Sequence, residues 1–491
     1  MMLNNLFNKE ELNNRIHTLF PVIEDLFYII IIAAWFTIAF LTGLHHEPWA
    51  DEAQSWLIAR DNSISSLIFK VLKYEGTPVL WYLQLKFAQF LQLPYKYIFL
   101  IPLINTGIGL YLLIFKSKLP NYIKCLFPFT FFIIYQYAVV ARNYSLFLPI
   151  LAFIAITYKK RLEKPFLYGF LLILLLSVSA QAYVLSVMLL ILFIYDNIKS
   201  HNYNIKFFTA TTIVAISALL TFLYLIKPAD CTFAASIEFP ALLSYINTLT
   251  DGYFNIKSIS MPVLATVAVI SMYACGFILF SKNAGQIIRS VLINACMIAV
   301  LTCLYCNYWH CGYVILTFIF TLWILTEENE NEIEIESKNK IVKNSFIVLF
   351  LSLAMIQIVW AFNCCYFDIH KSYSGSYNAY NYIVKNKLEQ YDITGLGFRT
   401  VALQPYFKHN IYKNFDKSYW EWRTDALINI HEKANDLTPV IVVDVNEAQK
   451  YADIIFQLNG YYVRVFEGSL YAKGSLKENT GIVVLVRKGV L

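Results

Sequence analysis

The stretch His45–Trp56, directly after the first long apolar segment, gathers residue types that could do chemistry. It has two adjacent histidines, and the carboxylate pair Asp51-Glu52 lies between two tryptophans. Tryptophan is common at a membrane interface, but ionisable groups there are costly unless they have partners or a function. We therefore interpret this stretch as part of a membrane-embedded active site.

The two carboxylates cannot both serve the same small cavity. A helix can begin at Pro48, and its residues Asp51 and Glu52 then point about 100° apart around the axis. Asp51 points away from the apolar face of this helix and is the candidate general base. Glu52 is the second candidate catalytic residue, and we expect it to pair with a basic group or to position the helix. The alternative is that both only stabilise the first helical turn, where acidic residues are favoured.

The composition identifies the class of protein. Of 491 residues, 58% are hydrophobic and only 15% are charged, against about a quarter in soluble proteins. The net charge of +6 is spread among loops, which suits lipid headgroups and not nucleic acid. Apolar runs between Leu26 and Phe362 predict an α-helical polytopic membrane protein. We expect about eleven spans, near 26–44, 97–115, 122–140, 145–158, 166–179, 182–195, 207–226, 261–280, 290–306, 312–326 and 344–362.

Charge predicts the orientation. If residues 1–25 are cytoplasmic, the compact basic clusters fall on the cytoplasmic side, as the positive-inside rule requires. These clusters lie near Lys116, Lys159–Arg161, Lys199, Lys282 with Arg289, and Lys338. The assignment requires that segment 79–93 does not cross. We therefore expect 45–96 to be one long external loop with two helices lying in the membrane plane.

With this orientation, the unusual loop sequences share the external face. Besides His45–Trp56 they are Glu75–Pro78, Ala141–Ser145, Ser179–Tyr183 and Tyr308–Gly312. The predicted orientation depends on the basic clusters and not on these loops, so their convergence on one face is what a single site would require.

Several of these residues could bind a divalent metal such as zinc or manganese. The nitrogen and oxygen ligands on offer are His45, His46, Glu47, Glu75 and His310. Three cysteines near His310 resemble a zinc set, but Cys303 and Cys306 lie in an apolar helix, where cysteine is a common packing residue. A metal is a candidate cofactor, and no other cofactor is indicated.

Residues 363–491 contain no run long enough to span a bilayer, and charged and turn residues are more frequent there. Strand-like runs at 439–445, 461–466 and 481–486 alternate with helical patterns at 377–391 and 446–458, which predicts a small α/β domain. The orientation places this domain outside, where it would guide an acceptor or contact a partner.

The motifs of the first external loop resemble those of the GT-C glycosyltransferases, which include the protein O-mannosyltransferases and the aminoarabinose transferases. In that superfamily the loop has an Asp-Glu motif, matched here by Asp51-Glu52, and a later Pro-Pro-Leu-type motif, matched by Thr77–Tyr82. Thr77 departs from the proline that is frequent there. In order and hydropathy the resemblance covers residues 26 to 326, and it implies a GT-C fold for the membrane module 26–362.

The resemblance also implies a reaction. A sugar on a polyprenyl phosphate would move to an external glycan, lipid or protein, with inversion, in the plasma (inner) membrane. Asp51 would take the acceptor's proton, while Arg142 and His310 would stabilise the leaving phosphate. Glu75 and Tyr144 complete the candidate binding residues.

Other interpretations stay open at this point. Arg142 could anchor a helix end, His310 and Tyr144 could be interfacial residues, and Glu75 could belong to a turn. For the whole chain, the alternatives are a transporter or flippase of lipid-linked sugars and a polymerase or ligase of surface glycans. A transporter would predict symmetric halves, and the sequence shows no internal repeat.

Overall fold

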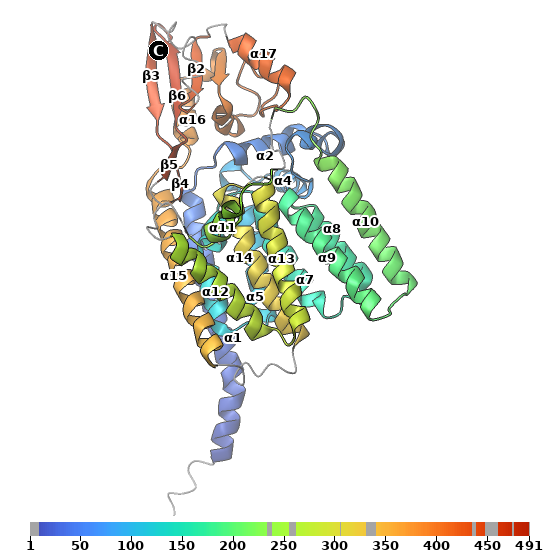
Figure 1. The fold of residues 1–491 in the computed structure, drawn as a ribbon. Helices are drawn as coiled ribbons and strands as arrows, with labels where there is room; N and C mark the ends of the chain where they lie inside the picture. The colour runs from blue at the N-terminus through green and yellow to red at the C-terminus, as the bar shows by residue number, and fades with distance from the viewer. Residues whose placement is uncertain are drawn as a thin grey trace, which may run out of the picture.

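The chain folds into a bundle of long helices with a small β-sheet domain at one end (Figure 1). The computed structural model describes residues 9–490 except 233–237, 255–261, 305, 330–339, 435–437, 447–459 and 474–475. Helices α2 and α4 lie between the bundle and the sheet domain, and the first half of α1 extends beyond the opposite end (Figure 1).

Eight helices in the described part of the chain are long and apolar enough to cross a membrane. They are α1 (Lys9–His45), α5 (Leu100–Lys116), α9 (Ala180–Lys199), α10 (Ile205–Leu225), α12 (Pro262–Phe280), α13 (Ala284–Cys303), α14 (Gly312–Glu328) and α15 (Lys340–His370). Two shorter apolar helices are α7 (Phe147–Tyr158) and α8 (Pro165–Leu176), and α11 covers Leu242–Asp251. A helical polytopic membrane protein is therefore confirmed, whereas the number of about eleven spans stays a prediction.

The expectation of one regular helix over 122–140 is wrong. The segment is broken into α6 (Asn121–Leu126), the 3-10 turn η4 (Phe127–Phe129) and the π-helical turn η5 (Phe132–Gln136). Pro128 has no N–H to continue the helix. Residues 130–141 are all buried, so their irregular backbone is enclosed by protein and not exposed to lipid.

Helix α14 is the centre of the bundle, with fifteen of its residues buried. Its first residue, Gly312, packs so closely that an added Cβ would lie 2.4 Å from the Tyr137 hydroxyl. The Tyr137 hydroxyl also donates a hydrogen bond to the carbonyl of Trp309 (2.8 Å). The turn η8 (Tyr308–His310) is thereby fixed on the core, at the end of the bundle that faces the sheet domain.

Charged residues meet at the opposite end of the bundle. Arg161 lies 2.7 Å from Asp196 and 3.0 Å from Glu328, and Arg289 lies 2.5 Å from the same glutamate. Helix α14 begins near the sheet domain and ends at Glu328, so this glutamate marks the opposite end of the bundle. Arg161 and Arg289, which belong to two of the predicted basic clusters, both lie at this end. Which end faces the cytoplasm stays a prediction.

Between α1 and α5 the chain forms short helices only. They are α2 (Ala50–Asp61), α3 (Ile64–Ser66), η1 (Leu67–Val71), η2 (Leu72–Tyr74), α4 (Leu80–Phe90) and η3 (Tyr95–Tyr97). Helix α4 has 11 residues and is about 16 Å long, too short for a hydrocarbon core of about 30 Å. Lys86 of α4 donates to the carbonyls of Ala59 (2.9 Å) and Asn62 (2.6 Å), which holds α4 against the end of α2.

The C-terminal domain has a four-stranded sheet of order β1-β2-β6-β3, in which only β1 and β2 are parallel. Its strands are β1 (Ile393–Leu396), β2 (Val440–Asp444), β3 (Tyr461–Phe466) and β6 (Ile482–Arg487), and β4 (Ser469–Lys473) pairs with β5 (Leu476–Asn479). Its helices are α16 (Ser376–Lys385), η9 (Leu388–Gln390), η10 (Phe398–Tyr406) and α17 (Thr424–Ala434). Strands β2, β3 and β6 match the predicted strands. The helix predicted at 446–458 lies outside the described residues, apart from Asn446.

Candidate functional site

A cavity of about 410 Å³ lies where the bundle meets the sheet domain. Helix α2, the loop before α7, the turn η8 and two segments of the C-terminal domain form its walls. The lining residues are Trp49, Asp51, Gln54, Glu75, Arg142, Tyr144, Asn307, Tyr308, Trp309, His310, Phe398, Arg399 and Trp422. Asp51, Glu75, Arg142, Tyr144 and His310, all singled out from the sequence, therefore lie in one cavity.

Asp51 and Arg142 form an ion pair in this cavity. Nη1 of Arg142 lies 3.1 Å from Oδ2 of Asp51, and both side chains are about one-fifth exposed. Burial is the largest single influence and acts to lower the pKa of Arg142, but Asp51, Tyr144 and Tyr82 together raise it by more, so the net shift is upward and the guanidinium stays charged. The cavity therefore combines a carboxylate with a permanent cation.

Glu52 points elsewhere, as the expected rotation of about 100° requires. Its side chain is fully buried and accepts hydrogen bonds from His46 Nε2 (3.1 Å), the backbone N–H of Trp49 (3.1 Å) and that of Ala141 (2.6 Å). The carboxylate has no access to the cavity, so its geometry is that of a residue that positions α2 and not of a catalytic group.

His46 links the start of α2 to α15. Its Nδ1 donates to Asp368 (2.7 Å) and its Nε2 donates to Glu52. Burial acts to lower the pKa of His46, but the two carboxylates raise it to about 10. The ring is therefore cationic at neutral pH, with both nitrogens occupied, which leaves none for a metal.

Glu75 contributes a second carboxyl group to the cavity. Gln54 donates to its Oε1 (3.0 Å). Burial raises the pKa of Glu75 to about 7, although the hydrogen bond from Gln54 and the charge of Arg142 act in the opposite direction. A carboxyl group with such a pKa can gain or lose a proton near neutral pH.

His310 positions Tyr144. The backbone N–H of Asn307 donates to His310 Nδ1 (3.0 Å), so the ring proton lies on Nε2, which is 3.2 Å from the Tyr144 hydroxyl. A neutral imidazole used in this way supplies no positive charge. Of the two residues expected to stabilise a phosphate, only Arg142 is a cation.

Of the expected metal ligands only Glu75 and His310 share the cavity, and the others are bound elsewhere. His45 donates to the Leu41 carbonyl of its own helix (2.9 Å), and Glu47 accepts from Gly375 (3.1 Å) and Ser376 (3.2 Å) at the start of α16. Among the described residues, no group of three or more His, Cys, Asp or Glu side chains is placed to hold a metal ion.

Sequence reasoning missed several contributors to this site, among them Gln54, Arg399 and Trp422. The Gln54 side chain pairs with the backbone of Trp420, donating to its carbonyl (2.7 Å) and accepting from its N–H (2.8 Å). The three-residue spacing from Asp51 puts Gln54 on nearly the same helix face and could have identified it. No local signal marked Arg399 or Trp422, because the packing of the sheet domain brings them to the cavity.

No family model, curated protein or solved structure matches this chain. The resemblance to GT-C glycosyltransferases therefore depends on the motifs of the first loop. Chemically, the arrangement offers one carboxylate beside a cation, a second carboxyl group that titrates near pH 7 and aromatic walls. These are the elements of general base catalysis with stabilisation of an anionic leaving group.

Proposed function

We propose that the protein is a membrane glycosyltransferase that moves a sugar from a polyprenyl-phosphate donor to an external acceptor. The observation that supports this most is the Asp51–Arg142 pair in a cavity between the helical bundle and the sheet domain. The resemblance of the first loop to GT-C enzymes supports the same reaction.

In the proposed reaction an acceptor hydroxyl or amine attacks the anomeric carbon of the donor sugar. The bond between that carbon and the phosphate oxygen breaks, and the configuration inverts. The proton of the acceptor passes to Asp51. Negative charge grows on the lipid phosphate, and a planar guanidinium such as that of Arg142 matches phosphate oxygens well.

Glu52 and His46 would position the active groups in this scheme. They are buried beside the first turn of α2 and connect it to Ala141 and α15. Their contacts fix the turn on which Asp51 lies without reaching the cavity. Glu75 would be the second proton-binding group near the acceptor.

The test is a comparison of surface glycans and lipid-linked sugars by mass spectrometry in cells with the native chain, with Asp51→Asn or without the protein. We expect Asp51→Asn to remove the glycosylated product and to cause accumulation of the lipid-linked donor. Asp392→Asn is the matched control, because Asp392 pairs with Lys413 at an exposed site. Product formation by Asp51→Asn would contradict the proposal, and so would movement of a sugar across the membrane without a new glycosidic bond.

A further inference from the structure

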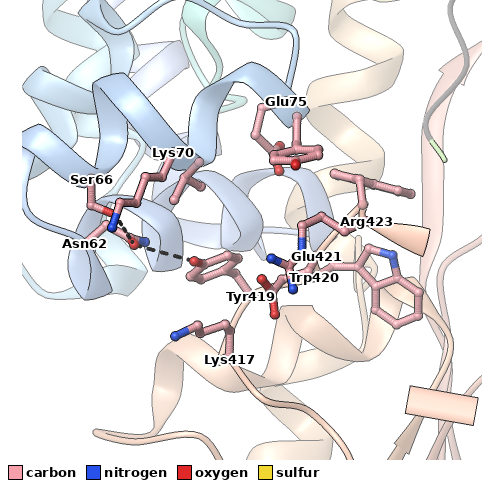
Figure 2. A pocket seen from close by; sticks show the side chains of 12 residues that line it. Asn62, Ser66, Lys70, Glu75, Lys417, Tyr419, Trp420, Glu421 and Arg423 are labelled. Carbon is pink, nitrogen blue, oxygen red and sulfur yellow. Dashed lines mark hydrogen bonds between the residues drawn. The ribbon is translucent and has the colours of Figure 1, made fainter. Parts of the chain in front are cut away.

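Figure 2 shows a second cavity, of about 300 Å³, which shares lining residues with the first. Glu75 and Trp422 line both cavities, so they form the wall between them. One side of the second cavity comes from the first loop, with Lys70 and Tyr74. The other side is segment 417–423 of the C-terminal domain.

Two lysines give this cavity positive charge from opposite sides. Lys70 belongs to η1 and Lys417 to the C-terminal domain, and both line the cavity. Within the part of the chain that the structure describes, neither ammonium group forms an ion pair with a carboxylate. By contrast, Arg423 in the same wall pairs with Asp425 (3.2 Å).

The acidic residues of the cavity do not cancel this charge. Only Glu75 and Glu421 are acidic among its lining residues. Burial raises the pKa of Glu75 to about 7, so this side chain is only partly ionised near neutral pH; burial also raises the pKa of Glu421, against the charges of Arg423 and Lys417. With Lys70 and Lys417 charged, the cavity favours an anion.

The remaining walls suit a polar ring molecule. Trp420 lines the cavity together with Tyr74, Tyr419 and Trp422, and its side chain is only 5% exposed. Asn62 and Ser66 add hydrogen-bonding groups, and aromatic walls with a few polar groups are typical of sites for small molecules (Figure 2).

We propose that this second cavity binds the acceptor and that the acceptor is a sugar with a negative charge, either a carboxylate or a phosphate. The inference rests on the proposed function, since the shared wall of Glu75 and Trp422 would place a bound acceptor next to the cavity of Asp51. The anionic group would lie between Lys70 and Lys417, and the sugar ring would lie against the aromatic side chains.

The test measures binding to the full chain in nanodiscs of neutral lipid, using the change in tryptophan fluorescence. The probes are digalacturonic acid, galactose 6-phosphate and the neutral disaccharide galactobiose. We expect at least one charged probe to bind more tightly than galactobiose, and the preferred probe to distinguish carboxylate from phosphate. Lys70→Gln and Lys417→Gln should each weaken its binding about tenfold, as loss of a charge-assisted hydrogen bond does.

Lys413→Gln is the control, because this lysine is exposed and already paired with Asp392. Equal binding of neutral and charged probes would overturn the inference. So would absence of binding by both charged probes, or unchanged binding in both single variants at Lys70 and Lys417.

Asp51→Asn separates this inference from the proposed function, since it should stop product formation and leave binding of the charged probe unchanged. If the probe binds and Asp51→Asn still forms product, the proposed catalytic role fails and the binding site stands. If product formation depends on Asp51 and no charged probe binds, the second cavity is not the acceptor site.

Discussion

Arg142 contacts two groups of Asp51 at once, although 91 residues separate them. Its Nη1 lies 3.1 Å from the side-chain Oδ2 and 3.0 Å from the backbone carbonyl oxygen of Asp51. One guanidinium therefore fixes both the carboxylate and the first turn of α2. Any ligand phosphate in this cavity would meet the same guanidinium, so Arg142 would link substrate binding to the placement of the proposed base.

Two substitutions of Arg142 should distinguish the effect of its positive charge on sugar transfer from the effect of its planar guanidinium. Arg142→Lys keeps the charge but loses the planar fork, and Arg142→Gln loses both. We expect initial rates of sugar transfer to fall about tenfold for the lysine variant and about 100-fold or more for the glutamine variant. Equal rates for the lysine variant and the native protein would show that the fork geometry has no part in the reaction.

Glu52→Gln should destabilise the fold more than Asp51→Asn does. The buried Glu52 carboxylate accepts three hydrogen bonds, one of them from the His46 cation. In Glu52→Gln the buried His46 cation loses one of its two carboxylate partners, which lowers the free energy of unfolding by about 3 kcal/mol. Asp51 is partly exposed, so its variant should lose less than about 1 kcal/mol. Denaturant unfolding of both variants in detergent measures this, and equal losses would contradict the division of roles.

Glu75 should make stability depend on pH. Its pKa is raised by burial to about 7, against an ordinary value of 4.5, so the folded protein binds more protons than the unfolded chain between these values. This contribution is fully present below about pH 4.5 and is lost as the pH rises through 7. Glu75→Gln cannot ionise and should lose less stability between about pH 5 and 8, by an amount on the order of 1 kcal/mol. Unfolding midpoints across this range measure the difference, and parallel curves would refute it.

Gln54 should hold segment 417–423 against α2. Gln54→Ala removes both hydrogen bonds to the Trp420 backbone, at a cost of about 2 kcal/mol. The backbone N–H of Trp420 should then exchange with deuterium faster, by local opening of this segment. Gln84→Ala is the control, because Gln84 pairs with Asn105 in the bundle. Faster exchange at Trp420 in the control as well would show a general loosening and not a local contact.

Cys306 and Cys311 should be cross-linkable. Their Sγ atoms lie 3.4 Å apart at either side of the turn η8. Oxidation by dioxygen with copper phenanthroline should convert the two thiols to a disulfide, with release of two protons and two electrons to the oxidant. Mass spectrometry of peptides without reduction should detect the 306–311 bond, and Cys306→Ser should abolish it. A bond from Cys306 to another cysteine instead would contradict the geometry of this turn.

Features of the site that depend on residues close together in the chain could be predicted from the sequence. The divergence of Asp51 and Glu52 follows from the helical rotation alone, and the structure shows one in the cavity and the other buried. Strand β3 has the predicted bounds because its residue types favour a strand along its whole length. The break at Pro128 contradicts the helix expected over 122–140, although proline is a local signal: its missing N–H interrupts the helix within an otherwise apolar run.

Partners that lie far apart in the chain could not be predicted. His46 and Asp368 are 322 positions apart, and Gln54 and Trp420 are 366 apart. The sequence around one partner contains no pattern that identifies the other. The sequence by itself determined that the chain is a helical membrane protein and which faces of α2 are polar, because hydropathy and helical period are local properties. Only the tertiary structure decided that the partner of Glu52 is His46, that His310 positions Tyr144 and that the sheet domain completes the cavity. Those roles depend on packing between distant segments, which sets each side chain's burial and hydrogen-bond partners.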